Sequence, residues 1–382
     1  MRENQFFKRM DRWLGVPLVA LLGWLSRRAE LFRVPPRRLG PGARVLAMKL
    51  SALGDTLLLL PSLKALKEQV GPEGRLEVLC TRVNLAALQG LPWVDAVHVY
   101  EPSHLLKRPW SVLALLWSLR RRRFHLGLDF EQWLRITPLL LLAAGARRRA
   151  GFDSPGQHRA GLFHAGAPQR KGEHESDAFA ALALAAGCSV APEDFAGFLA
   201  RHGLYGAVPW SAQGKAVLLH PGCGGKGWQR EWPEERWVRL AQDLSAAGWQ
   251  VGLSGAGERE DAANARIAAA SGGAARPLPA TAGLPGLVAA LLAQRLLISG
   301  NTGVMHLAAG LGLPLLALHG PTDPVKWGPR ALPGRARVLE AGIDCSPCLF
   351  YGFDYGCPRR DCMESIPQDS VKNQALELLV EA

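Results

Sequence analysis

Three glycine-containing junctions between predicted strands and helices carry the residue types that could do chemistry. The first, Lys49–Asp55, includes Ser51 and places Gly54 directly before a predicted helix. Its acid, Asp55, has two interpretations: it caps the helix, or it projects from the sheet edge as a general base. Taken by itself, this junction favours capping.

The second junction is His220–Lys226, which Arg230 follows. Small residues such as Gly222 allow backbone N–H groups to approach a ligand, and a guanidinium just before a helix suits a diphosphate. The alternative is an ordinary loop before a helix that begins at Pro233. The stretch Gly222–Gly227 matches the dinucleotide pattern G-x-G-x-x-G only weakly, because its helix begins late and no acid follows the next strand.

The third junction, Ser299–His306, predicts an anion site at the start of a helix. Asn301, Thr302 and Gly303 lie where backbone N–H donors and a hydroxyl gather at a helix N-terminus. His306 follows about one turn into the helix. It is either a structural hydrogen-bonding residue or a ligand contact.

Four of the seven cysteines fall within 18 residues near the end of the chain: Cys345, Cys348, Cys357 and Cys362. This spacing in a reducing compartment predicts a tetrahedral thiolate site for zinc or iron. Four thiolates leave no open position, so the metal would be structural. The alternative is a set of free thiols in a loop that also contains Tyr351, Phe353 and Tyr355.

Strand-like and helix-like segments alternate in two series around these junctions. The first series predicts strands at 44–48, 75–80, 96–100 and 125–129 and helices at 55–69, 83–89, 110–122 and 133–144. The second predicts strands at 216–220, 249–254, 296–299 and 314–318 and helices at 234–247, 258–271, from 302 and at 368–382. Repeated strand-then-helix units predict two α/β domains with parallel sheets and a ligand cleft between them.

Composition and charge narrow the class of protein. With 382 residues, 48% hydrophobic and 20% charged, the chain is neither disordered nor a multi-span membrane protein. The phosphate loop of nucleotide hydrolases and the usual zinc-protease and α/β-hydrolase motifs do not occur.

The net charge of +12 is concentrated in two segments. Residues 1–44 contribute +7 and residues 107–149 contribute +8, which leaves −3 for the rest. No nucleic-acid-binding motif accompanies them, so an anionic lipid or glycolipid surface is the better partner. The alternative for the runs Arg120–Arg123 and Arg147–Arg149 is a solvated helix face.

An apolar segment, Trp13–Leu25, carries basic residues on both flanks and is too short to span a bilayer comfortably. It predicts an anchor in the membrane interface, or else a helix packed on its own domain. Without a secretory signal, we expect a cytoplasmic protein that attaches peripherally to a membrane face. The predicted parts are an interfacial segment 1–40, a first α/β domain 41–210, a second α/β domain 211–340, and a Cys-rich loop with a closing helix at 341–382.

Several motifs in order resemble those of the ADP-heptose:lipopolysaccharide heptosyltransferases, glycosyltransferase family 9. They are Ser51–Asp55, His220–Gly222, Trp232-Pro233, Gly300–Ala308 and His319–Asp323. The resemblance implies a GT-B fold, in which two Rossmann-like α/β/α domains face a central cleft. It also implies transfer of a heptose, with inversion and without a catalytic metal or other cofactor, from ADP-heptose to a lipid-linked acceptor.

The resemblance further implies that domain 41–210 binds the acceptor and domain 211–340 binds the nucleotide-sugar, with a role for each matching residue. Asp55 corresponds to the base that deprotonates the acceptor hydroxyl, with Ser51 and Gly54 on the acceptor side. The nucleotide-sugar would contact these residues: Gly222, Arg230, Glu258, Asn301, Thr302, Gly303 and His306. Arg230, Thr302 and Gly303 would stabilise the departing diphosphate, and Glu258 would hold the ribose.

Two positions depart from the family pattern. Arg230 stands where the family usually has Lys, and Asn301 stands where it usually has Asp, which removes a negative charge near the sugar or phosphates. Some relatives, the autotransporter heptosyltransferases, have a four-cysteine iron site near the same end of the chain. The alternatives left open are therefore a protein O-heptosyltransferase, a nucleotide-sugar epimerase, and an inactive membrane-bound binding module.

Overall fold

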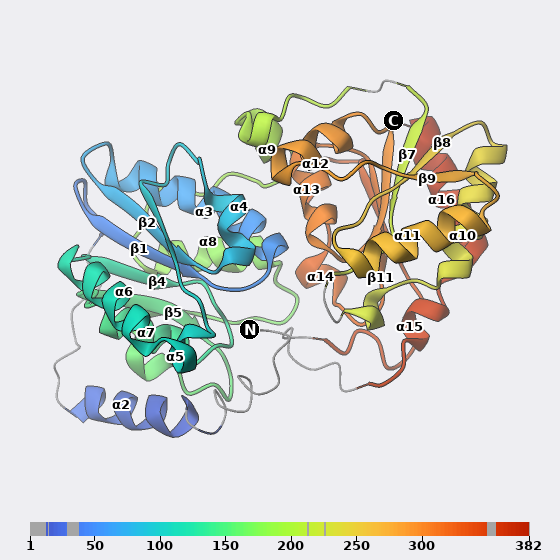
Figure 1. Ribbon diagram of the computed structural model, residues 1–382. Helices are drawn as coiled ribbons and strands as arrows, with labels where there is room; N and C mark the ends of the chain where they lie inside the picture. Colours follow the sequence, from blue (N-terminus) through green and yellow to red (C-terminus); the bar gives the residue numbers. More distant parts are fainter. Residues whose placement is uncertain are drawn as a thin grey trace. The chain divides into compact units, whose positions relative to one another are not determined.

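The computed structural model describes residues 13, 15–28, 38–211, 214–224, 227–349 and 357–381. It divides the chain into two compact units, Met1–Glu193 and Asp194–Ala382. Each unit contains one six-stranded, fully parallel sheet with helices on both faces (Figure 1). The prediction of two parallel α/β halves is confirmed.

The first unit has the strand order β3-β2-β1-β4-β5-β6. Its strands are β1 (Arg44–Lys49), β2 (Arg75–Cys80), β3 (Ala96–Val99), β4 (Leu126–Asp129), β5 (Arg148–Asp153) and β6 (Ala165–Pro168). Its helices are α2 (Val16–Arg28), α3 (Leu53–Val70), α4 (Arg82–Leu88), α5 (His104–Lys107), α6 (Pro109–Arg121), α7 (Ile136–Ala143), the 3-10 helix η2 (Ala160–Leu162) and α8 (Glu175–Ala185). Helices α3 and α8 pack together on one face of the sheet, and α6 and α7 pack together on the other.

The second unit repeats this topology with the order β12-β11-β10-β7-β8-β9. Its strands are β7 (Ala216–His220), β8 (Gln250–Leu253), β9 (Ala275–Pro277), β10 (Leu296–Gly300), β11 (Leu315–His319) and β12 (Ala336–Glu340). Its helices are α9 (Phe198–Arg201), η3 (Leu204–Gly206), η4 (Trp228–Arg230), α10 (Glu234–Ala246), α11 (Glu258–Ala270), α12 (Gly283–Leu292), α13 (Gly303–Leu311), α14 (Pro324–Trp327), α15 (Asp361–Glu364) and α16 (Gln368–Glu381). Side chains of α10, α15 and α16 join the central strands in one buried apolar core.

In each unit the strand order reverses between two neighbouring strands. These are β1 and β4 in the first unit, and β7 and β10 in the second. Connections from the two strands then run to opposite faces of the sheet, so their first loops part and leave a crevice at the carboxyl edge. The candidate residues after β1, β7 and β10 therefore lie at the positions where parallel sheets bind ligands.

Helix α2 packs on its own unit and also leaves an apolar side exposed. Val19 is fully buried, and Gly23 lies against Gly161 of η2, where an added Cβ would come within 3.3 Å of the Gly161 backbone. Leu21 and Trp24 are about half exposed. The expected flanking residues Lys8, Arg9, Arg12 and Arg33 lie outside the described ranges. None of the helices in those ranges is both long and apolar enough to cross a membrane.

The interpretation of Arg147–Arg149 as part of a basic surface is wrong for Arg149, whereas Arg147 is exposed. Strand β5 begins at Arg148, and Arg149 is only 4% exposed. Its guanidinium donates hydrogen bonds to the carbonyl oxygens of Leu162 and Ala146, at 3.0 and 3.1 Å. Burial lowers the pKa of Arg149 to about 10. A run of like charges does not reveal that it enters a strand buried on both faces, as Arg149–Phe152 is.

Candidate active site

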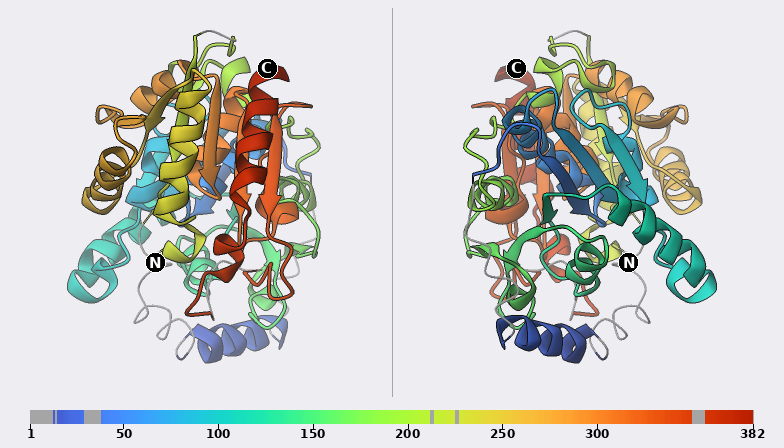
Figure 2. Two further views of the ribbon diagram at one scale, coloured as in Figure 1. Left: turned by 90° about the vertical axis from the view of Figure 1, so that its right-hand side faces the viewer. Right: turned by 90° about the vertical axis from the view of Figure 1, so that its left-hand side faces the viewer.

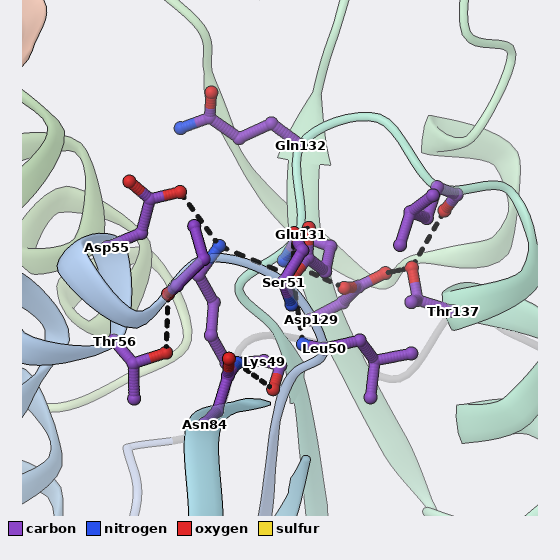
Figure 3. Close-up of polar contacts among 12 residues, drawn as sticks. Lys49, Leu50, Ser51, Asp55, Thr56, Asn84, Asp129, Glu131, Gln132 and Thr137 are labelled. Atoms are coloured by element: carbon purple, nitrogen blue, oxygen red, sulfur yellow. Dashed lines mark hydrogen bonds and ion pairs between the residues drawn. The ribbon is translucent and has the colours of Figure 1, made fainter. Parts of the chain in front are cut away.

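The carboxyl ends of β1 and β4 bring together a buried acid–base cluster (Figure 3). It consists of Lys49 and Asp55 from the first junction and Glu131 from the loop after β4. All three are at most 5% exposed. Asp55 was expected from the sequence, whereas Glu131, two residues beyond the strand that pairs with β1, was not.

Glu131 fixes the loop that follows β1. Its carboxylate accepts hydrogen bonds from the backbone N–H groups of Leu50 and Ser51, at 2.8 and 2.7 Å. It also accepts the hydroxyl of Ser51, at 2.9 Å to either oxygen. Ser51, expected on the acceptor side, therefore uses its hydroxyl to hold the loop.

Lys49 bridges the two acids of the cluster. Its Nζ lies 3.5 Å from Asp55 Oδ2 and 3.3 Å from Glu131 Oε1, with only 2% of the lysine side chain exposed. A cation this close to a buried carboxylate favours the ionised form, which a general base requires. The backbone of Lys49 is fixed as well, because Asn84 Nδ2 donates to its carbonyl oxygen at 3.0 Å.

The start of α3 sets the position of Asp55. The helix begins after Ala52, whose φ of 64° lies in the left-handed region and whose side chain makes no capping bond. Thr56 Oγ1 donates to the Ala52 carbonyl at 2.9 Å. Gly54 and Asp55 are both buried in the first turn. Asp55 is thus not the cap residue, and its carboxylate pairs with Lys49 instead.

A second buried ion pair anchors the end of β4. Arg159 pairs with Asp129 and donates to the Glu131 carbonyl oxygen at 2.6 Å. Thr137 Oγ1 donates to Asp129 Oδ2 at 2.6 Å, and the backbone N–H of Glu131 donates to Asp129 Oδ1 at 3.0 Å. Glu131 is held in place from behind while its carboxylate holds the β1 loop in front.

In the second unit, Arg230 joins the loops that follow β7 and β10. It donates to the carbonyl oxygen of Cys223 at 2.9 Å and to that of Asn301 at 3.0 Å. Its Nε is buried and has no hydrogen-bond partner among the described residues. The predicted cation therefore lies between the second and third junctions. Lys226 lies outside the described ranges.

Glu260, which the sequence analysis missed, explains why a glycine occupies position 222. A Cβ at Gly222 would lie 2.3 Å from the Glu260 carboxyl carbon. That carboxylate accepts from the N–H groups of Gly224 and Ala256, at 2.8 and 2.9 Å. It joins the loop after β7 to the loop after β8. The predicted ribose contact, Glu258, is exposed in the first turn of α11.

Two buried histidines lie at the carboxyl edge of this sheet. Burial lowers the pKa of His220, with the Glu260 carboxylate opposing the shift, and His220 Nδ1 lies 3.0 Å from Ser254 Oγ. Burial lowers the pKa of His319 to about 4. Both imidazoles are therefore neutral at pH 7 and contribute no positive charge to this edge.

Asn301 is used as a hydrogen-bond donor. Its Nδ2 donates to the Trp327 carbonyl oxygen at 2.7 Å and lies 3.5 Å from His319 Nε2. An ionised Asp has no hydrogen to donate to that carbonyl. The departure from the family pattern at this position thus matches its surroundings in this chain.

Helix α13 begins as the third junction predicts. Thr302 is the cap residue, its hydroxyl accepting from the backbone N–H of Met305 at 3.4 Å and lying 3.1 Å from Ser299 Oγ. Gly303 opens the first turn and is partly exposed, while His306 is buried one turn later. The first-turn N–H groups lie at the same sheet edge as Arg230.

The predicted four-thiolate metal site is not supported. The described ranges include all four cysteines, yet within them no group of three or more His, Cys, Asp or Glu side chains could hold a metal ion. Cys345 and Cys348 are exposed in a loop whose backbone bonds to Pro321, whereas Cys362 is buried in α15 close to Gly320. Tyr351, Phe353 and Tyr355, between these parts, lie outside the described ranges.

Comparison with known proteins gives one consistent family. The sequence profile of glycosyltransferase family 9 (heptosyltransferase) matches residues 112–356. The chain is 39% identical to lipopolysaccharide heptosyltransferase 1 of Pseudomonas aeruginosa over 137 residues, 35% of this chain and 36% of that protein. It is 26% identical to lipopolysaccharide heptosyltransferase 1 of Escherichia coli O18:K1:H7 over 296 residues, 74% of this chain and 87% of that protein. The match to the Pseudomonas protein spans only about a third of its length.

Solved structures show the same fold. The E. coli heptosyltransferase WaaC with ADP superimposes with a TM-score of 0.68 at 20% identity, covering 88% of this chain and 99% of that one. A family 9 glycosyl transferase from Veillonella parvula gives 0.70 at 18% identity, covering 91% of this chain and 100% of that one. The predicted GT-B class, built from two Rossmann-like α/β/α units, is confirmed.

Proposed function

Because the chain belongs to glycosyltransferase family 9, we propose that it transfers a heptose, with inversion, from ADP-heptose to a hydroxyl of the lipopolysaccharide core or another lipid-linked acceptor. The observation that carries this proposal is the buried pair of Asp55 and Lys49 at the switch point of the first sheet. A structural neighbour solved with ADP and relatives named lipopolysaccharide heptosyltransferases support the choice of donor and acceptor.

In the proposed reaction, Asp55 removes the proton from the acceptor hydroxyl. The acceptor oxygen forms a bond to the anomeric carbon from the face opposite the nucleotide. The bond from that carbon to the phosphate oxygen breaks, and ADP departs with the electron pair. Lys49 keeps Asp55 ionised before the proton transfer, and Glu131 keeps both residues in place.

The second unit would bind the donor and stabilise the charge on the departing ADP. Arg230 and the first-turn N–H groups of α13 supply donors at one sheet edge, and such fixed donors need no reorganisation during the reaction. No catalytic metal is needed in this proposal. Contacts of the nucleotide-sugar with Gly222, Glu258, Asn301 and His306 remain predictions from the family resemblance.

The proposed location is the cytoplasmic face of the inner membrane, with the chain attached peripherally. A lipid-linked acceptor has its reactive hydroxyl at that surface. The exposed apolar side chains of α2 and the excess of basic residues in the N-terminal segment support this placement.

The test combines ligand binding with acceptor-dependent turnover. ADP should raise the unfolding temperature more than UDP, GDP or NAD, because a ligand at one hundred times its dissociation constant adds about 2.7 kcal/mol to the folded state. ADP release from ADP-heptose should require a lipopolysaccharide-core acceptor. Asp55→Ala should abolish release while the thermal shift with ADP persists.

Other outcomes would favour the alternatives. Product without an acceptor would indicate an epimerase, and transfer to protein but not to glycolipid would indicate a protein O-heptosyltransferase. ADP binding without any product would indicate a binding module. Wild-type turnover by Asp55→Ala would remove Asp55 from the mechanism.

A further inference from the structure

The outer side of helix α6 is an exposed aromatic surface. Trp110, Leu113 and Trp117 are 66%, 66% and 62% exposed. They are three and seven residues apart, so they share one face of the helix. The buried residues of the same helix, Val112 and Leu119, are also seven apart and hold its opposite side against the unit. Figure 2 shows α6, in teal, at the outer edge of the first unit in both views.

Positive charge surrounds this aromatic surface. The sequence has no acidic residue between Glu101 and Asp129. Exposed cations flank α6 at both ends: Lys107, Arg108, Arg120, Arg121 and Arg123. The Arg121 guanidinium lies 4.6 Å from the centroid of the Trp117 ring, so a cation adjoins the apolar side chains.

The other arginine of the run has a different role. Arg122 donates to Oε1 of the buried Glu77 carboxylate at 3.0 Å, and His98 Nε2 lies 2.7 Å from Oε2 of the same carboxylate. This ion pair fixes the end of α6 to the sheet. The aromatic surface is therefore presented by an anchored helix, and Arg122 takes no part in it.

We propose that the outer face of α6 docks on an anionic phospholipid surface, with the three apolar side chains among the headgroups and the flanking cations on lipid phosphates. Tryptophan and long basic side chains suit this depth, because each combines an apolar body with a polar end. A second copy of the chain is a poorer occupant. A twofold interface would place the same cationic surface on both sides, and like charges would repel.

The proposal does not depend on the transfer reaction, so its test uses no substrate. The full chain is sedimented with vesicles of phosphatidylcholine alone or mixed equally with phosphatidylglycerol. Wild-type protein should bind the mixed vesicles, and more weakly as salt is added. Trp110→Ser/Leu113→Ser/Trp117→Ser should weaken binding by at least about tenfold, since each side chain loses apolar burial. Lys107→Gln/Arg108→Gln/Arg121→Gln should weaken it about 100-fold at low salt, at about fivefold per cation.

Matched controls separate the contribution of this surface to vesicle binding from that of other exposed apolar residues and from that of the N-terminal segment. Val83 and Leu184 are 65% and 49% exposed elsewhere in the same unit, so Val83→Ser/Leu184→Ser should bind as wild type. Trp110→Phe/Trp117→Phe should also bind as wild type, yet show less tryptophan quenching by brominated lipids. Circular dichroism of each variant checks that the fold is intact.

Three results would overturn the proposal. The first is equal vesicle binding by the triple-serine variant and wild type. The second is wild-type protein that does not distinguish the two kinds of vesicle. The third is a wild-type dimer that the triple-serine substitution converts to a monomer without changing vesicle binding, which would assign the face to self-association.

Discussion

Replacing Glu131 with Gln tests whether the geometry of the acid–base cluster depends on a buried residue that has almost no contact with solvent. Glu131 is 1% exposed, and its carboxylate receives four donors from three residues: Lys49, Leu50 and Ser51. The amide is nearly the same size. Glu131→Gln therefore removes the charge and one acceptor while leaving the packing almost unchanged.

The expected loss of stability follows from these contacts. A hydrogen bond to a charged group contributes about 1.5–3 kcal/mol, and a neutral one about 0.5–1.5 kcal/mol. Neutralising an acceptor of four donors should thus cost about 1 kcal/mol per bond, or about 4 kcal/mol in all. Removal of one partner from a buried ion pair gives the same range, about 3–5 kcal/mol.

Activity should fall as well, because the loop held by Glu131 leads directly into the first turn of α3 and Asp55. A misplacement of about 1 Å in a reacting group costs about 100-fold in rate. Turnover should fall by about this factor in Glu131→Gln. Glu131→Asp keeps the charge on a shorter side chain, so its turnover should lie between that of wild type and that of Glu131→Gln.

Stability of the first unit is measured by urea unfolding, monitored through the exchange of the backbone amides of β1 and β4. Activity is measured as acceptor-dependent ADP release. The matched control is Glu68→Gln, which removes an exposed ion pair with Lys64 and should change stability by less than about 1 kcal/mol. If Glu131→Gln unfolds and turns over like wild type, the cluster does not position Asp55, and the reasoning fails.

Three further predictions concern the second unit. Gly222→Ala should displace the Glu260 carboxylate, destabilise the unit by about 1–3 kcal/mol and weaken ADP binding. The control is Gly40→Ala, where a Cβ meets nothing within 4 Å. Unchanged ADP affinity in Gly222→Ala would contradict the prediction. Asn301→Asp should cost about 1–3 kcal/mol in urea unfolding, because the Trp327 carbonyl loses its donor; an unchanged midpoint would show that this bond is dispensable. The pKa of His319 is about 4 in the folded protein and 6.5 in the unfolded chain, so the unfolded chain takes up a proton first as the pH falls. The free energy of unfolding is therefore highest above pH 6.5 and decreases by about 3 kcal/mol towards pH 4. His319→Gln should reduce that slope, and an identical slope in both proteins would refute the assignment.

Local sequence patterns predicted most of the strands and helices that meet at the carboxyl edges of the two sheets. Strand β2 at Arg75–Cys80 and β7 at Ala216–His220 have the predicted bounds, and α3 and α10 differ from them by at most two residues. Their apolar runs and preceding Gly or Pro residues are local signals. Strands β5 and β6 were missed, because one begins with arginines and the other, Ala165–Pro168, contains Gly and Pro.

The candidate site was predicted only in part. Asp55, Arg230 and Thr302 were singled out because their junctions have recognisable composition, and their proposed roles came from the family resemblance. Glu131 and Glu260 were not found, since a glutamate two residues after a strand or inside a helix looks like any solvated acid. The one available signal for Glu131 was its position two residues after the predicted strand 125–129.

The sequence by itself determined the alternation of strands and helices, the three junctions and the family, because each depends on neighbours along the chain. The tertiary structure decided which charges are buried and what they bind. Glu131 lies 81 residues from Leu50 and 82 from Lys49, yet it holds both, because β1 and β4 become neighbours only when the sheet forms. In the same way, Arg149 became a buried donor and Arg121 an exposed cation, although both belong to arginine runs. Burial of a charge depends on the partners that the fold brings to it, and these partners are distant in sequence.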